Sequence, residues 1–136
     1  KQKLCHFFTV NNLFHLQRGG RVSKVSAVFG SMLGIKPVLH VNNEGKLIPI
    51  AKVRGRKASL DYLVNAAMKK LDKEKAKKFF VSHGDCYDDA KYVADRMTKE
   101  FGIQENMIHM IGPVIGSHSG DGTVALFFLG SDRDPV

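Results

Sequence analysis

The stretch that decides the order of the secondary structure is residues 78–111, KFFVSHGDCYDDAKYVADRMTKEFGIQENMIHMI. Lys78 to Ser82 is a short apolar run that is typical of a buried strand. Asp85 is expected to cap a helix with helical apolar spacing, and Gly102 is expected to end it, because glycine accepts the left-handed conformation at a helix end. Asn106 to Ile111 follows as a second strand. A strand, a helix and a strand in this order favour an α/β fold.

The segments on either side continue the same alternation. Thr123 to Leu129 is a last, nearly continuous apolar strand, and residues 60–71 carry apolar side chains at helical period. Pro37 to Val41 and Lys46 to Val53 are strand-like, and residues 42–45 between them tolerate the positive φ of a hairpin turn. The chain is therefore expected to form one α/β domain, residues 1–136, with a mixed sheet and helices packed on it.

Two helices are expected between Val10 and Leu33. Thr9 is a candidate cap for a short helix from Val10 to Gln17, which the glycine pair Gly19-Gly20 would end. Val22 to Leu33 then has apolar residues at spacings of three and four, which predicts a second helix with a broad buried face.

The composition limits the classes of protein to which this chain can belong. The chain has 136 residues, 43% of them hydrophobic and 25% charged, which is typical of a globular domain. It contains no run of about 18 apolar residues, so no membrane span is predicted. Its two cysteines, Cys5 and Cys86, and its six histidines lack the spacings of disulfide frameworks or zinc sites, so we expect no metal and a reducing cytoplasm. The chain starts without methionine, which suggests that it was cut from a longer protein.

Net charge points to anionic partners without identifying them. The formal charge is +8, with one basic run at Lys52 to Lys57 and another between Lys69 and Lys78. Charged runs are often only solvated surface, and this reading is favoured for the second run. The basic residues are not interleaved with aromatic ones, and no nucleic-acid-binding motif is present. The hypothesis of a nucleic-acid-binding module therefore rests on electrostatics alone.

The densest candidate site is the glycine-rich segment Ile111 to Gly122, IGPVIGSHSGDG. Glycines at this density are usually present for positive φ or for close approach of the backbone, and such loops present N–H groups to anions. His118, flanked by Ser117 and Ser119, adds an imidazole and two hydroxyls. No lysine follows the glycines as in a phosphate loop, and the next segment is a strand, unlike in a Rossmann fingerprint. The alternative is a tight structural turn with a surface histidine.

Arginines flank a second glycine turn, Arg18-Gly19-Gly20-Arg21. Two guanidinium groups beside the N-terminal amides of the following helix would favour a carboxylate or phosphate. The alternative is a helix stop with two solvated arginines. No enzyme is predicted, since adjacent residues such as Ser117 and His118 cannot form a catalytic triad. His83, which follows a strand, is more often structural than a ligand.

Five segments in this order resemble the C-terminal domain of the DegV family. They are FTVNNLFHLQRGGRVS (8–23), GIKPVLH (34–40), KVRGRKA (52–58), SHGD (82–85) and IGPVIGSHSGDGT (111–123). The resemblance implies a bacterial, cytoplasmic lipid carrier of two α/β domains that holds one long-chain fatty acid in a tunnel between them. It also implies a fatty acid kinase as partner, which phosphorylates the presented carboxylate, so that the carrier itself performs no reaction and needs no cofactor.

The resemblance also assigns roles to residues. It implies that His118 hydrogen-bonds the carboxylate or the acyl phosphate and that Arg21 lies near the head group, with Gly116, Ser117 and Ser119 belonging to the same ligand-binding segment. Arg54, Arg56 and Lys57 would lie on the surface offered to the kinase. Asp121 departs from the family pattern, which usually has proline there, and adds a negative charge near the anion site.

The resemblance further implies that the family's N-terminal domain is missing from this chain. The isolated domain is therefore expected to bind fatty acid weakly, because one domain cannot bury an acyl chain worth about 0.8 kcal/mol per CH₂ group. A transient contact with a membrane surface is compatible with a lipid carrier. The alternative function is a basic module that binds anions or nucleic acid, although no nucleic acid is expected as the partner.

Overall fold

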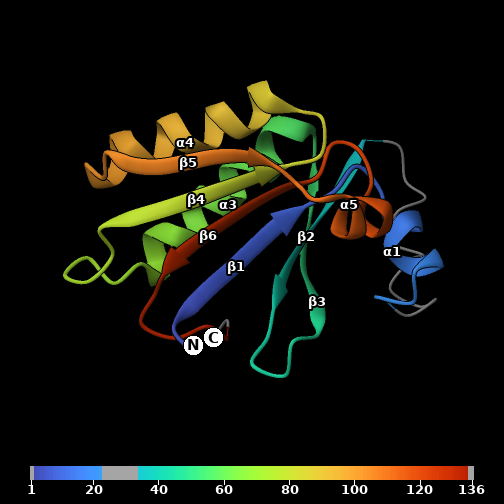
Figure 1. Ribbon diagram of the computed structural model, residues 1–136, viewed down its shortest axis with the longest axis horizontal. Coiled ribbons are helices and arrows are strands. Elements are labelled where there is room, and N and C mark those ends of the chain that lie inside the picture. The colour runs from blue at the N-terminus through green and yellow to red at the C-terminus, as the bar shows by residue number, and fades with distance from the viewer. Residues whose placement is uncertain (1, 23–33, 135–136) are drawn as a thin grey trace.

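The predicted strand, helix and strand form β4 (Lys78–His83), α4 (Tyr87–Phe101) and β5 (Glu105–Met110) in a computed structural model that describes residues 2–22 and 34–134. These residues contain a six-stranded sheet in the order β3-β2-β1-β6-β4-β5 (Figure 1). β4 and β5 are parallel, and the other neighbouring strands are antiparallel. The remaining elements are β1 (Leu4–Thr9), α1 (Phe14–Arg18), β2 (Ile35–Val41), β3 (Leu47–Arg54), α3 (Arg56–Lys70), α5 (Pro113–Ser119) and β6 (Val124–Leu129). The expected mixed α/β sheet is confirmed.

The ends of α4 were predicted with mixed success. Gly102 has a left-handed backbone, with φ of 69°, and its N–H donates to the carbonyl of Thr98, as expected of a helix end. The prediction that Asp85 caps the helix was wrong. Asp85 has a φ of 51°, which is not the extended conformation of a cap, and Cys86 occupies the cap position. The Nδ1 atom of His83 accepts a hydrogen bond from the Cys86 N–H over 3.2 Å.

The N-terminal segment contains a strand that the sequence did not reveal. β1 pairs with β2 on one side and with β6 on the other, so it lies inside the sheet. Thr9 ends this strand and does not cap a helix, because its hydroxyl donates to the carbonyl of Pro37 over 2.8 Å. Helix α1 is consequently shorter than predicted. The helix expected over 22–33 lies almost entirely outside the described residues.

The hairpin and the later elements agree with the sequence. β2 and β3 pair in antiparallel register from Ile35 and Arg54 to Val41 and Leu47, with one irregularity between Val38 and Leu39. α3 begins four residues before the predicted start at Leu60, and β6 matches its predicted range closely.

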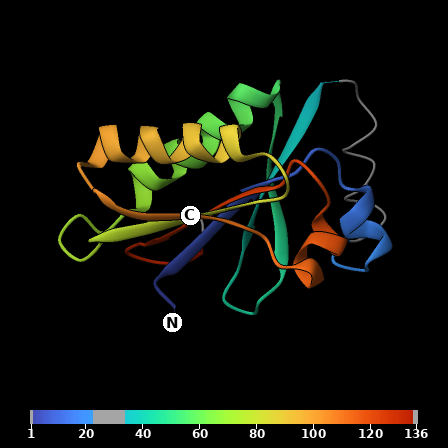
Figure 2. The same cartoon turned by 45° about the horizontal axis from the view of Figure 1, so that its top comes forward.

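The two faces of the sheet differ. α3 and α4 lie side by side over one face, whereas α1 and α5 lie together at one end of the sheet (Figure 2). Residues of β6 alternate accordingly: Val124, Leu126 and Phe128 are buried in the core beneath α3 and α4, whereas Ala125 and Phe127 are only half-buried. Along β4 and β5, large apolar side chains such as Phe80 and Met107 are exposed. The described residues thus leave much of the second face uncovered.

Candidate functional site

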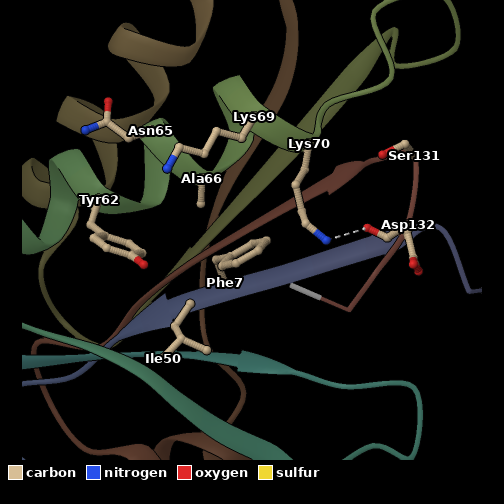
Figure 3. Close-up of a pocket in the computed structure, with 9 residues that line it drawn as sticks. All are labelled: Phe7, Ile50, Tyr62, Asn65, Ala66, Lys69, Lys70, Ser131 and Asp132. Carbon is tan, nitrogen blue, oxygen red and sulfur yellow. Dashed lines mark hydrogen bonds between the residues drawn. The ribbon is translucent and has the colours of Figure 1, made fainter. Parts of the chain in front are cut away.

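Two cavities of similar volume mark possible sites in the described part of the chain. The first, about 630 Å³, lies between α3 and the sheet, with Phe7 and Ile50 opposite Tyr62 of the helix (Figure 3). The ammonium group of Lys70 donates to the backbone carbonyl of Asp132 at its edge, over 3.4 Å. This cavity contains none of the residues that the sequence singled out for ligand binding.

The second cavity, about 610 Å³, lies on the uncovered face and does contain them. His118, Ser119 and Arg21 line one part of it. Its remaining wall is largely apolar and draws on every strand of the sheet. The lining includes Phe8 of β1, Val41 of β2, Leu47 of β3, Met110 of β5, Ala125 and Phe127 of β6, and the polar Ser82 of β4 and His109 of β5. The cavity is therefore an apolar groove along the sheet with cationic and imidazole groups in its wall.

Helices α1 and α5 hold His118 in place by a reciprocal contact. A side-chain Cβ at Gly19 would lie 2.3 Å from Nδ1 of His118, so any other residue there would force the imidazole to shift. In the same way, a Cβ at Gly120 would lie 2.6 Å from Cδ2 of His15. Each helix thus packs a histidine against a glycine beside the other helix, and this contact brings the turn before Arg21 next to His118.

Arg21 is exposed and lines the same groove as His118. One of its Nη1 hydrogens is donated to the carbonyl of Gly19. A guanidinium has five N–H donors, so this bond leaves others for a ligand carboxylate. The N–H groups of Gly19 and Gly20 donate to carbonyls of α1 and are not offered to a ligand. The amides that were expected to begin the helix after Val22 lie outside the described residues.

The glycine-rich segment is not an open loop, which corrects the sequence-based expectation. Residues 113–119 form helix α5, with Pro113 at its start, where a missing N–H costs nothing. The N–H of Gly116 donates to the carbonyl of Gly112 over 2.9 Å, and that of Gly120 donates to Gly116 over 2.8 Å. The N–H of Gly122 donates to Gly84 over 2.7 Å. These three glycines support the fold and do not form an anion cradle.

The serines on either side of His118 are engaged with the helix backbone. The hydroxyl of Ser117 donates to the carbonyl of Val114 over 2.8 Å, and that of Ser119 donates to Ile115 over 3.0 Å. A carboxylate only accepts hydrogen bonds, so hydroxyls whose hydrogen is already donated cannot hold it. Ser117 and Gly116 are also not among the residues that line the groove. Of the predicted ligand-binding residues, His118 and Arg21 line the groove with side-chain N–H groups that the backbone of α5 does not use.

The three basic residues predicted to face the kinase, Arg54, Arg56 and Lys57, do not share one environment. Arg54 at the end of β3 is exposed, and the exposed Lys57 pairs with Asp61 over 3.2 Å. The side chain of Arg56 is only 22% exposed, and its Nε donates to Asp89 over 2.8 Å. Arg54 and Lys57 are available at the surface, whereas Arg56 is used within the domain.

A group of exposed apolar side chains beside the groove was missed by sequence reasoning. Phe80, Met107, Met110, Val114 and Ile115 are 40% to 71% exposed, and we call them the apolar rim. Phe80 pairs across the sheet with Phe127 of the groove and with Met107, so these side chains share the uncovered face. Large apolar side chains exposed in this number on one part of a domain are typical of a binding site or an interface. Its sequence signal is the apolar pair directly before Gly116 in a helix too short to bury it.

The floor of the groove includes a histidine that the sequence did not single out. The ring of His6 packs edge-on against Phe127, with centroids 5.0 Å apart. Its Nε2 is buried and has no hydrogen-bond partner among the described residues. Burial lowers the pKa of His6, and the positive charge of Arg133 lowers it further. A neutral imidazole at this position fits an apolar wall.

The turn before β6 leaves no space at Gly84. A Cβ at this position would lie 2.6 Å from the backbone oxygen of Gly120, and a backbone atom cannot move aside as a flexible side chain can. We therefore expect Gly84→Ala to lower the free energy of unfolding by about 2 kcal/mol, as overpacking does. Urea denaturation followed by circular dichroism would measure it. Gly112→Ala is the matched control, because its Cβ meets nothing within 4 Å, and an equal loss in both variants would contradict the steric argument.

Within residues 2–22 and 34–134, no group of three or more His, Cys, Asp or Glu side chains is placed to hold a metal ion. The same residues contain no helix with the length and apolar character needed to cross a bilayer.

Comparison with known proteins places the chain in a family. The DegV family model matches residues 1–131. A DegV domain-containing protein of Clostridium perfringens is 45% identical over 135 residues, which are 99% of this chain and 46% of that protein. The chain thus spans about half the length of the curated relatives that it matches.

Solved structures agree in fold. The fatty acid binding DegV family protein from Streptococcus agalactiae has a TM-score of 0.79 and 34% identity, over 96% of this chain and 46% of that one. A Thermotoga maritima protein, described as revealing a fatty acid binding function, has a TM-score of 0.76 and 28% identity, over 94% and 43%. Because the family model matches residues 1–131 and the Clostridium perfringens relative is 45% identical over 99% of the chain, the chain belongs to the DegV family.

Proposed function

We propose that this chain is the C-terminal domain of a bacterial, cytoplasmic fatty-acid carrier. The observation that carries the proposal is the apolar groove that leads to both His118 and Arg21. Imidazole and guanidinium N–H groups are suitable donors to a carboxylate, and the strand side chains of the groove are suitable contacts for an acyl chain. The fatty acid binding described for the similar Streptococcus agalactiae protein supports this choice of ligand.

The groove provides one wall of the binding site. An acyl chain gains about 0.8 kcal/mol for each CH₂ group removed from water, and it gains this fully only when it is enclosed on all sides. The apolar rim continues the groove outward, with Val114 71% exposed and Ile115 61% exposed. We propose that the rest of a full-length protein packs on this rim and closes the second wall.

The carboxylate end of the bound acid is the part offered to a partner. In this proposal a fatty acid kinase docks on the exposed basic side chains Arg54 and Lys57 and phosphorylates the carboxylate. The domain contributes binding and orientation, and the kinase supplies the chemistry. The motifs shared with the DegV family support this step, together with the exposure of these two cations.

Native mass spectrometry tests the proposal. We expect the full-length protein purified from cells to retain one long-chain fatty acid, released on denaturation, because both walls then enclose it. We expect the 136-residue chain alone to bind oleate at least tenfold more weakly in calorimetric titration, since half of the acyl surface stays in water. Tight stoichiometric binding by the isolated chain would contradict the two-wall model. Nucleic acid that co-purifies in place of lipid, and is lost steeply with salt, would favour a basic binding module.

A further inference from the structure

Arg56 connects three parts of the domain. It is the first residue of α3, and its Nε donates to Oδ2 of Asp89 in the first turn of α4 over 2.8 Å. Its Nη2 donates to the backbone carbonyl of Gly122, two residues before β6, over 2.6 Å. The planar guanidinium therefore holds the starts of two helices and the turn that follows α5 in one arrangement.

The contact with Gly122 continues toward the head-group site. The next residue, Thr123, is 2% exposed and lines the groove. Its hydroxyl lies 2.8 Å from the carbonyl oxygen of Gly120 and 3.1 Å from that of Ser119. Ser119 is the last residue of α5 and follows His118 directly. Arg56 is therefore connected to the end of the helix that carries His118 by its own hydrogen bond to Gly122 and by those of the neighbouring Thr123 hydroxyl.

The turn that contains Gly122 is also held by contacts that do not involve Arg56. The N–H of Gly122 donates to the carbonyl of Gly84, and the N–H of Gly84 donates to the carbonyl of Thr123. A Cβ at Gly122 would lie 2.1 Å from Nδ2 of Asn11, so the segment before α1 packs closely on the same turn. These contacts fix the turn to β4 and to the N-terminal segment, whereas Arg56 fixes it to α3 and α4.

The bonding of Arg56 is not the arrangement that stability alone would favour. Its Nη1 is buried and has no acceptor among the described residues. A buried donor without a partner reduces what the ion pair with Asp89 contributes to stability. The geometry instead aims one N–H group at the carboxylate and another at the Gly122 carbonyl.

We propose that Arg56 is a positioning residue for the head-group site: it sets the orientation of α5, and with it His118, through the carbonyl of Gly122. The ligand readout in its test rests on the proposed fatty-acid binding, whereas the positioning itself does not. This role differs from a direct contact with the kinase, which the burial of the Arg56 side chain disfavours.

The test compares Arg56→Lys and Arg56→Met in the full-length protein, with Lys91→Met as a control for loss of an exposed, ion-paired cation on α4. Lysine keeps a positive charge beside Asp89, but all its N–H donors are on one nitrogen, whereas arginine has donors on separate nitrogens. We expect the Kd for oleate to rise about fivefold in Arg56→Lys and about tenfold in Arg56→Met, since small displacements of binding groups are costly. We expect the control to stay within twofold. The NMR signals of the His118 ring and the Ser119 amide should shift in both Arg56 variants.

Each outcome decides the proposal. A lower Tm with unchanged oleate affinity and an unchanged His118 signal in both variants would show a merely stabilising Arg56 and overturn it. Unchanged affinity and signals with reduced kinase-dependent phosphorylation would show a docking residue and overturn it as well. If the unmutated protein does not bind oleate, the proposed function fails, and the His118 and Ser119 signals still decide whether Arg56 positions α5.

Discussion

Replacing Val114 and Ile115 together by aspartate is expected to reduce the oleate affinity of the full-length protein by about 1000-fold or more, because the two new carboxylates would have to leave water at a cost of several kcal/mol each. In the domain described here both side chains are exposed, at 71% and 61%. They lie on α5 next to the proposed position of the lipid carboxylate, which the new charges would also repel. Calorimetric titration and the amount of lipid retained on purification measure the effect.

The 136-residue chain itself should tolerate this double change. Surface substitutions usually alter the free energy of unfolding by no more than about 0.5 kcal/mol each, so its urea midpoint should move little. Met68→Asp is the matched control, since Met68 is 49% exposed on α3 and does not line the groove. The proposed role of the apolar rim would be wrong if the double variant kept its oleate affinity within tenfold of the unmodified protein.

His118→Ala is expected to weaken oleate binding by the full-length protein about 30-fold. The substitution removes a hydrogen bond to a charged carboxylate, and such bonds contribute about 1.5–3 kcal/mol. Kinase-dependent formation of acyl phosphate should fall with it, because the carboxylate is no longer held. The fold should persist, since His118 is only half-buried and its contact lies at the edge of the domain. Titration calorimetry and an acyl-phosphate assay with the kinase provide the readouts.

His15→Ala provides the control for this substitution. His15 packs against Gly120 just as His118 packs against Gly19, but it does not line the groove. Loss of either imidazole should weaken the contact between α1 and α5, whereas in the proposed site only His118 contacts the ligand. Equal losses of affinity in the two variants would mean that His118 acts through helix packing and not through the carboxylate.

Local sequence patterns were sufficient where an element's own residues decide its structure. The apolar spacing of α3, the glycine that ends α4 and the turn between β2 and β3 are all short-range features, and each was predicted. Strand β1 was missed because its stability comes from β2 and β6, whose partner residues lie 29 or more positions away in the chain. Helix α5 was missed because glycine and proline usually interrupt helices, and here they begin and end one.

The candidate site shows the same division. His118 and Arg21 were selected from their motifs, and the groove in which both lie supports that selection. Serine hydroxyls and glycine amides were expected to serve the ligand, but the backbone of α5 uses them. Arg56 was expected at the partner surface, but its side chain is used within the domain. Sequence spacing cannot show that this long side chain reaches back to Gly122.

The sequence by itself determined that this chain is an α/β domain, that it resembles the DegV family and that His118 and Arg21 are its candidate head-group donors. Residue types and their spacing are enough for such conclusions, since they fix periodicity and chemistry. Only the tertiary structure decided which side-chain donors line the groove, which face of the sheet the described residues leave uncovered and where Arg56 points. These properties depend on contacts between segments far apart in the chain, such as Gly19 with His118 and Arg56 with Gly122, and no local pattern encodes them.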